Sequence, residues 1–427
     1  MKKRILLKGP ILSRSGYGEQ ARFAMRSLLS RQDIFDVYLF NIPWGKTGWV
    51  WENDEERKEI DQLLFKTVTL PENDRKFDAS LQVTIPNEFE KIAPINIGYT
   101  AGIETDRIAP EWIQKSSIMD KIIVVSKHSK DVYESTGYKV ELKNGEIREF
   151  KNHTPVEYIN YPNRLASPDA NFDIDFDSDF NFLVFSQWGP RKNIENTIAW
   201  FVDEFRNDDV GLVLKIFSFN CATPDYYITK ERLENFVKRL GEKKCKIHLL
   251  HGDLTDAQLS ALYNHEKIKA IATATHGEGF GLTMFEASCA GLPVIAPDWS
   301  GHKDFLYANV KTTRKGKTKE KVRPLFVKVD YKLGDVQQEA IWPGVINEGS
   351  QWCFPDPTSF KDAMRKTYKN YGPALSSARK LKKINLDRFT EEKMQNEFVD
   401  KLLTIPGLSV SEEEIEWIEE LEKIEVL

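Results

Sequence analysis

Two glutamates, Glu278 and Glu286, have seven residues between them in a glycine-rich stretch of the sequence. Carboxylates accept paired hydrogen bonds from neighbouring hydroxyl groups, so these residue types suit the hydroxyls of sugar rings. We expect Glu278 in a turn at the mouth of a site and Glu286 about one turn into the helix that follows. The pair predicts a site for a ligand with two sugar rings, such as a nucleotide sugar.

The elements around the glutamates predict a phosphate site beside them. Segment 269–275 predicts a buried strand, residues 276–281 a glycine-rich turn, and residues 282–290 a helix. Amides at a helix start and the helix dipole favour phosphate, which we expect near Gly281, Leu282 and Thr283. A purely structural interpretation, with one solvated and one capping glutamate, stays open because a G-x-G pattern by itself is weak.

A pair of cations, Arg191 and Lys192, follows the apolar segment 181–186. A nucleoside diphosphate gains negative charge as it leaves a sugar, and positioned cations stabilise that charge. The pair therefore fits a site for a leaving diphosphate. On the residues alone it also fits an exposed loop.

The elements that would position these residues follow from an alternation of apolar and amphipathic segments. Strands are expected over residues 4–8, 36–41, 79–85, 95–99, 121–126 and 156–160, and over 181–186, 211–218, 246–252, 269–275 and 293–297. Amphipathic segments between them predict helices, so the fold class is α/β with two Rossmann-like halves and parallel sheets. We expect domains over residues 1–165 and 166–400, and an acidic helix over 401–427 that can pack back on the first domain.

The segment HGEGFGLTMFEASCAGLPVIAPDWSG, residues 276–301, resembles the donor-binding signature of the family-4 retaining glycosyltransferases. That resemblance implies the GT-B fold, in which two Rossmann-like domains face each other across a cleft. It also implies that Glu278 contacts the donor sugar and Glu286 the nucleotide ribose, with the amides of Phe280, Gly281 and Leu282 on the phosphates. The resemblance covers residues 1–310 well and the rest loosely.

Other parts of the chain match the family less closely. Lys192 matches the family lysine, but Gln187 stands where an arginine is usual, and we hypothesise that Arg191 supplies the missing charge. By resemblance the first loop places Gly16 near the donor phosphates. The acceptor-side candidates of that loop and of the segment 98–106 are Arg14, Tyr17, Glu104 and Asp106.

The resemblance implies transfer of a sugar, with retention, from a nucleoside diphosphate to an acceptor hydroxyl. Catalysis would rest on Glu278, Lys192 and Arg191. We expect no cofactor and no obligatory metal, and interpret the acidic run 173–179 as solvated. Other activities of the fold, an epimerase or a phosphorylase, and a non-catalytic binding module are the alternatives.

Composition restricts the partners. The 427 residues carry a net charge of −5, which excludes a uniformly basic coat for nucleic acid. Four scattered cysteines, no apolar run of membrane-spanning length, and a start unlike a signal peptide favour a cytoplasmic protein. The acceptor stays open among a saccharide, a lipid and a modified base in DNA. The basic segment 311–323 could bind an anionic partner or be a mobile surface loop.

Overall fold

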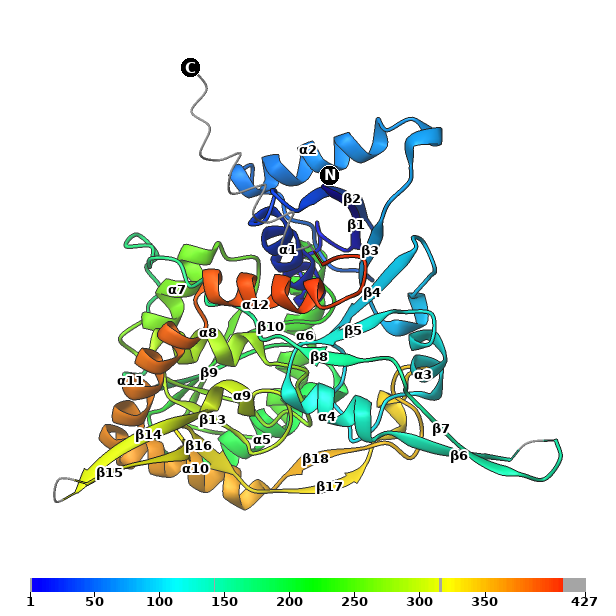
Figure 1. Cartoon of the computed structure of the whole chain (residues 1–427). Helices are drawn as coiled ribbons and strands as arrows, with labels where there is room; N and C mark the ends of the chain where they lie inside the picture. Colours follow the sequence, from blue (N-terminus) through cyan, green and yellow to red (C-terminus); the bar gives the residue numbers. More distant parts are fainter. Residues whose placement is uncertain (1, 142, 315–316, 410–427) are drawn as a thin grey trace.

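The computed structural model describes residues 2–141, 143–314 and 317–409 (Figure 1). Most of the acidic helix expected over residues 401–427 lies outside the described residues. Within them the chain forms two six-stranded parallel sheets, which confirms the predicted α/β architecture. None of the described helices is long and apolar enough to cross a membrane.

The first sheet has the strand order β2-β1-β3-β4-β5-β8. Its strands are rich in consecutive apolar residues because helices and loops cover both faces. In sheet order they are β2 (Phe35–Asn41), β1 (Lys3–Gly9), β3 (Ala79–Val83), β4 (Ile95–Thr100), β5 (Lys121–Val124) and β8 (Val156–Tyr158).

The second sheet has the order β11-β10-β9-β12-β13-β16. The strand order reverses between β9 and β12. From β9 the chain continues to β10 on one side of the sheet, whereas from β12 it continues to β13 on the other side. In sheet order its strands are β11 (Lys246–Leu250), β10 (Gly211–Phe217), β9 (Asn181–Gln187), β12 (Ile268–Ala272), β13 (Val294–Pro297) and β16 (Val327–Val329).

The helices connect the strands and cover the sheets. In the first half they are α1 (Gly16–Leu29), α2 (Glu55–Val68), α3 (Pro110–Ser116) and α4 (Lys127–Ser135). The second half contains α5 (Ile194–Phe205), α6 (Thr223–Arg239), α7 (Asp256–Asn264), α8 (Leu282–Ala290), α9 (Lys303–Leu306), α10 (Pro357–Lys369) and α11 (Tyr371–Arg388). Several begin at side-chain caps, such as Ser15 for α1 and the capping box of Thr255 and Gln258 for α7.

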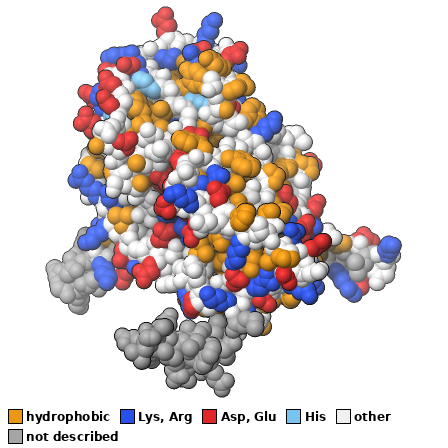
Figure 2. Space-filling view, turned by 90° about the horizontal axis from the view of Figure 1, so that it is seen from above, with side chains coloured by type: hydrophobic (Ala, Val, Ile, Leu, Met, Phe, Trp, Pro, Cys, Tyr) orange, Lys and Arg blue, Asp and Glu red, His pale blue; other side chains and the backbone are white. Residues whose placement is uncertain are grey.

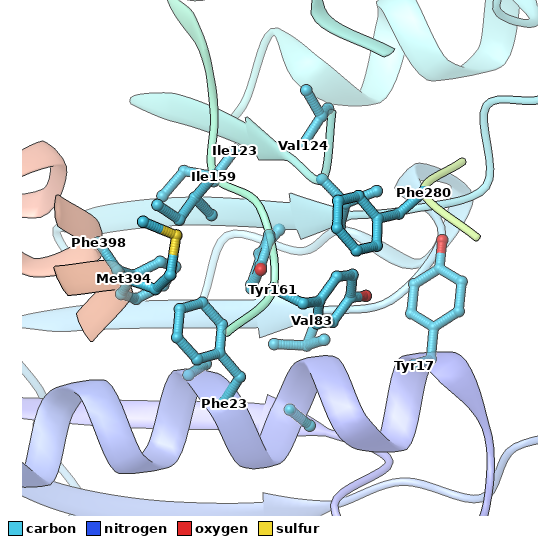
Figure 3. Close-up of a cluster of buried hydrophobic side chains, with 14 of the residues drawn as sticks. Tyr17, Phe23, Val83, Ile123, Val124, Ile159, Tyr161, Phe280, Met394 and Phe398 are labelled. Carbon is cyan, nitrogen blue, oxygen red and sulfur yellow. The ribbon is translucent and has the colours of Figure 1, made fainter. Parts of the chain in front are cut away.

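The last described helix, α12 (Glu391–Leu403), crosses back from the second half and packs on the first sheet (Figure 1). Phe398 on α12 is fully buried, with its ring centroid 5.5 Å from that of Phe23 and 5.3 Å from that of Tyr99. Figure 3 shows this cluster continuing past Tyr161 to Phe280, which comes from the turn before α8. One hydrophobic core therefore joins the two halves.

Within the described part of the chain, three two-stranded antiparallel ribbons lie outside the sheets, and the strand pattern did not predict them. They are β6 (Gly137–Glu141) with β7 (Ile147–Lys151), β14 (Tyr307–Arg314) with β15 (Lys317–Pro324), and β17 (Tyr331–Asp335) with β18 (Gln351–Pro355). Residues 311–314 and 317–323 of the basic segment belong to the second ribbon. A surface loop was one of the two alternatives for this segment, and it is wrong for these residues because cross-strand pairing, rather than an apolar run, defines the strands.

Candidate functional site

The candidate site lies where the strand order of the second sheet reverses. Ligands of open α/β sheets bind at the carboxyl ends of the strands beside such a point. Here β9 leads into the turn 188–193, and its neighbour β12 leads into the glycine-rich turn 273–281. The two turns carry the predicted cations and the first predicted glutamate.

Glu278 binds both cations of the facing turn. The Nζ atom of Lys192 lies 2.5 Å from Oε1 of Glu278, and a terminal nitrogen of Arg191 lies 3.1 Å from Oε2. The same nitrogen of Arg191 donates to the carbonyl oxygen of Gly277 at 2.7 Å. The structure thus brings Glu278, Lys192 and Arg191 into one cluster.

Burial and charge set the protonation of this cluster. Burial acts to raise the pKa of Glu278, but the positive charges of Lys192 and Arg191 outweigh it and bring that pKa to about 2. Burial lowers the pKa of Lys192, and the charge of Arg191 lowers it further. A carboxylate at 278 therefore persists at every physiological pH.

Two residues with left-handed backbone shape the turns. Asn193 has φ 53° and donates from Nδ2 to the carbonyl oxygen of Ala274 at 3.0 Å, which fastens one turn to the other. Ser300 has φ 72°, and its Oγ accepts a hydrogen bond from the amide of Glu278 at 2.9 Å. Backbone in this region is strained for residues other than glycine, so tertiary contacts must maintain it. We did not predict either residue as part of the site.

The glycine-rich turn also contacts the first half of the molecule. A Cβ atom on Gly277 would lie 2.2 Å from the carbonyl oxygen of Glu104, and one on Gly279 would lie 2.1 Å from that of Ala101. Glu104 in turn has Oε1 3.6 Å from Nε of Arg191. These glycines permit the close approach of two domain backbones, a role that the sequence did not reveal.

Helix α8 begins at this turn without a side-chain cap. Gly281 occupies the N-cap position with φ 97°, and no side chain of the described residues caps the helix there. A Cβ on Gly16, the first residue of α1, would have Leu282 as its nearest neighbour, at 4.0 Å. Two residues that we predicted near the donor phosphates, one from each domain, therefore lie side by side.

A small cavity of about 10 Å³ lies between the turns. Its lining includes Lys192, Glu278 and Thr283. This volume suits about one water molecule, so the cavity is too small to enclose a whole nucleotide sugar.

Glu286 lies one turn further along α8, where burial raises its pKa to about 8. The hydroxyl group of Tyr263 donates to its Oε2 at 2.9 Å and partly opposes this increase. The carboxyl of Glu286 is therefore neutral at pH 7, in contrast to that of Glu278.

The acceptor-side candidates Arg14 and Tyr17 already have partners within the protein. Arg14 pairs with Glu52 at 2.5 Å and, across the cleft, with Asp253 at 3.2 Å. The hydroxyl of buried Tyr17 hydrogen-bonds Thr100 at 2.8 Å and accepts from two amides, those of residues 101 and 102.

Asp106 and Gln187 also lie apart from the charged cluster. Oδ1 of Asp106 accepts the amide of Gln351 at 2.7 Å, a contact that joins the domains. Gln187 donates to the carbonyl oxygen of Ser218 at 3.0 Å instead. Among the described residues, no group of three or more His, Cys, Asp or Glu side chains is arranged to hold a metal ion.

Two facing Rossmann-like domains form the GT-B fold, and solved glycosyltransferases share this fold over nearly the whole chain. A sucrose-phosphate synthase from Thermosynechococcus elongatus aligns with a TM-score of 0.60 at 13% identity, over 94% of this chain and 98% of that one. A glycosyltransferase from Rickettsia africae aligns with a TM-score of 0.57 at 12% identity, over 96% of this chain and 100% of that one. HepE from Anabaena, solved in complex with UDP-glucose, aligns with a TM-score of 0.53 at 12% identity, over 94% of this chain and 100% of that one. No protein-family model and no curated protein sequence matches the chain.

Proposed function

We propose that this protein is a retaining glycosyltransferase that moves a sugar from a nucleoside-diphosphate sugar to an acceptor hydroxyl. The observation that carries the proposal is the buried cluster of Glu278, Lys192 and Arg191 at the reversal point of the second sheet. The shared fold and the resemblance of residues 276–301 to family 4 support it. HepE was solved with UDP-glucose, which suggests a uridine donor as the first to test.

The cluster has the charges that sugar transfer requires. Lys192 and Arg191 would turn from Glu278 to the diphosphate and stabilise the negative charge that develops as the glycosidic bond breaks. The amides at the start of α8 would hold the same phosphates. Glu278, kept ionised by its neighbours, would accept hydrogen bonds from the hydroxyls of the donor sugar.

The finer features of the reaction rest on the resemblance. In retaining transfer of this type the acceptor hydroxyl attacks from the face that the diphosphate leaves, and the leaving phosphate takes its proton. We propose that the two cations and the helix amides replace a metal ion. We further propose that Arg191 takes the place of the family arginine, because its side chain lies on Glu278 while that of Gln187 binds Ser218.

Incubation of the protein with a panel of nucleotide sugars, starting with UDP-glucose, tests the proposal. We expect slow release of the nucleoside diphosphate without acceptor, faster release with the correct acceptor, and full activity in EDTA. The anomeric configuration of the product, read by NMR, should match that of the donor. A binding module would release nothing.

The variant Glu278→Gln tests the site. It keeps the side-chain shape and removes the charge, so transfer should fall about 100-fold or more at a temperature where the variant is folded. The melting temperature should also fall, because the buried cations Lys192 and Arg191 lose their partner. The matched control is Glu231→Gln, at an exposed position on α6, which should leave transfer unchanged. Unchanged transfer in Glu278→Gln would contradict the assignment of the site.

A further inference from the structure

The arm formed by β14 and β15 separates its charges between its two faces. Successive side chains of a strand alternate between faces, so Lys319, Lys321 and Arg323 share one face of the ribbon. Glu320 lies on the other face, directly opposite Lys311 in the register of the pair. Glu320, the described acid of the arm, therefore lies on the face opposite the three cations.

No carboxylate of the described residues pairs with Lys319, Lys321 or Arg323, and all three side chains are exposed. Their register partners Val310 and Ala308 add no opposing charge to that face. The protein as a whole is acidic, with a net charge of −5. An anionic partner would therefore be attracted to this arm rather than to the molecule at large.

A second arm, β6 with β7, provides an internal comparison. It projects from the side of the molecule opposite the β14–β15 arm (Figure 1), and acidic side chains lie among its cations (Figure 2). Nε of Arg148 lies 2.7 Å from Oε1 of Glu146, and Nζ of Lys151 lies 2.9 Å from Oε2 of Glu149. The unbalanced charge is therefore a property of the β14–β15 arm and not of ribbons in this protein.

We propose that the face of Lys319, Lys321 and Arg323 is a docking surface for double-stranded nucleic acid. Alternate residues of an antiparallel strand are roughly 6.8 Å apart. Consecutive phosphates of one B-DNA strand are separated by a similar distance, because each step combines a rise of ~3.4 Å along the axis with a rotation around it. A two-stranded ribbon also fits the major groove.

The same surface is poorly arranged for a membrane. Membrane-binding elements present apolar side chains beside their cations on one face. Val310 shares the face of the three cations, but it packs against the hydrophobic core of the protein. Val322 is 65% exposed, and alternation places it on the face opposite the three cations. The docking surface goes beyond the proposed transferase activity, since binding is measured without turnover.

Binding of a fluorescent duplex DNA of mixed sequence, followed by anisotropy from about 50 to 200 mM salt, tests the proposal. We expect the triple variant Lys319→Gln, Lys321→Gln, Arg323→Gln to bind about tenfold or more weakly at low salt. The slope of log affinity against log salt should become shallower by about 2 to 3, because each phosphate contact contributes about 0.9. The matched control removes the same charge from the other arm, with Lys139→Gln, Arg148→Gln and Lys151→Gln, and should keep both the affinity and the slope.

Three results would overturn the proposal. The first is an unaltered protein that does not bind duplex DNA at low salt. The second is a triple variant with the affinity and slope of the unaltered protein or of the control. The third is binding to vesicles of phosphatidylcholine and phosphatidylglycerol that the triple variant loses more strongly than DNA binding, which would assign the face to a membrane.

Discussion

At the scale of single residues, the two glutamates of the site differ in charge. Lys192 and Arg191 overcome the burial of Glu278 and keep it ionised, with a pKa of about 2. Glu286 lacks a cation of this kind, and burial brings its pKa to about 8. At pH 7 a ligand would meet one carboxylate and one carboxylic acid, so Glu286 can donate as well as accept a hydrogen bond.

The neutral form of Glu286 makes stability depend on pH. Because the pKa of Glu286 is higher in the folded protein than in the unfolded chain, its protonated form stabilises the fold. This contribution to the free energy of unfolding is fully present below pH 4.5, the ordinary pKa of glutamate, and is lost as the pH rises towards 8. The variant Glu286→Gln is uncharged throughout and escapes this loss. The difference in free energy of unfolding, variant minus unaltered protein, should therefore increase by up to about 1.4 kcal/mol per pH unit between pH 5 and 8.

Urea unfolding of both proteins at several pH values in that range measures the difference. A difference between them that stays constant with pH would show that Glu286 is ionised in the folded protein.

The residues that carry charge could be predicted, and those that shape the backbone could not. Glu278, Lys192 and Arg191 belong to patterns that are visible in the sequence, and the structure brings their side chains together. Asn193 and Ser300 act through left-handed backbone and contacts with residues far along the chain. Nothing in their immediate neighbours marks such contacts.

At the scale of elements, the glycine-rich turn has two roles. It begins helix α8, and it contacts the backbone of the first domain. The backbone of Glu104 comes so close to Gly277 that a methyl group has no room. This contact also sets Glu104 beside Arg191 and Glu278. The turn therefore couples the approach of the domains to the geometry of the charged cluster.

The variant Gly277→Ala tests that coupling. Its Cβ would lie 2.2 Å from the Glu104 oxygen, so the domains must separate locally. We expect a loss of about 1–3 kcal/mol in the free energy of unfolding and a marked fall in sugar transfer. Denaturant unfolding and a transfer assay measure the two effects.

Gly189→Ala is the matched control, because a Cβ at that position meets no atom within 4 Å and its φ of −147° suits alanine. If Gly277→Ala behaved like this control, the close approach of the two backbones would not exist in solution.

The sequence predicted the buried strands better than the ribbons. A strand such as β10 is apolar at nearly every position, apart from Gly211 and Lys215, because both of its faces are covered. The strands β14 and β15 consist largely of lysine, arginine and threonine, and only their mutual register reveals them. Helix α11 is also hard to recognise in the sequence, since it follows α10 after one residue and carries Pro373 in its first turn.

At the scale of the whole molecule, α12 fastens the second half to the first. Arg26 on α1 lies 2.9 Å from Glu391 at the start of α12, and it also binds Glu19 and Glu56. Phe398 fills the space between Phe23 and Tyr99. The first sheet thus depends on residues from the far end of the chain.

The variant Phe398→Ala measures that dependence. A fully buried phenylalanine replaced by alanine costs about 3–5 kcal/mol in the free energy of unfolding, and we expect a loss of this size in urea denaturation. Phe65→Ala on α2, where the side chain is 70% exposed, should change stability by about 0.5 kcal/mol or less. Equal effects of the two substitutions would mean that α12 does not dock.

The return of α12 bears on how the protein is made. Ribosomes add roughly 5–20 residues per second, and early domains usually fold while later ones are still being synthesised. Here the aromatic layer of Phe23, Tyr99 and Phe398 closes only after residue 398 has left the ribosome. The first domain must therefore wait, incomplete, through the translation of nearly the whole second domain, and a chaperone that shields its open side during this interval should increase the yield of native protein.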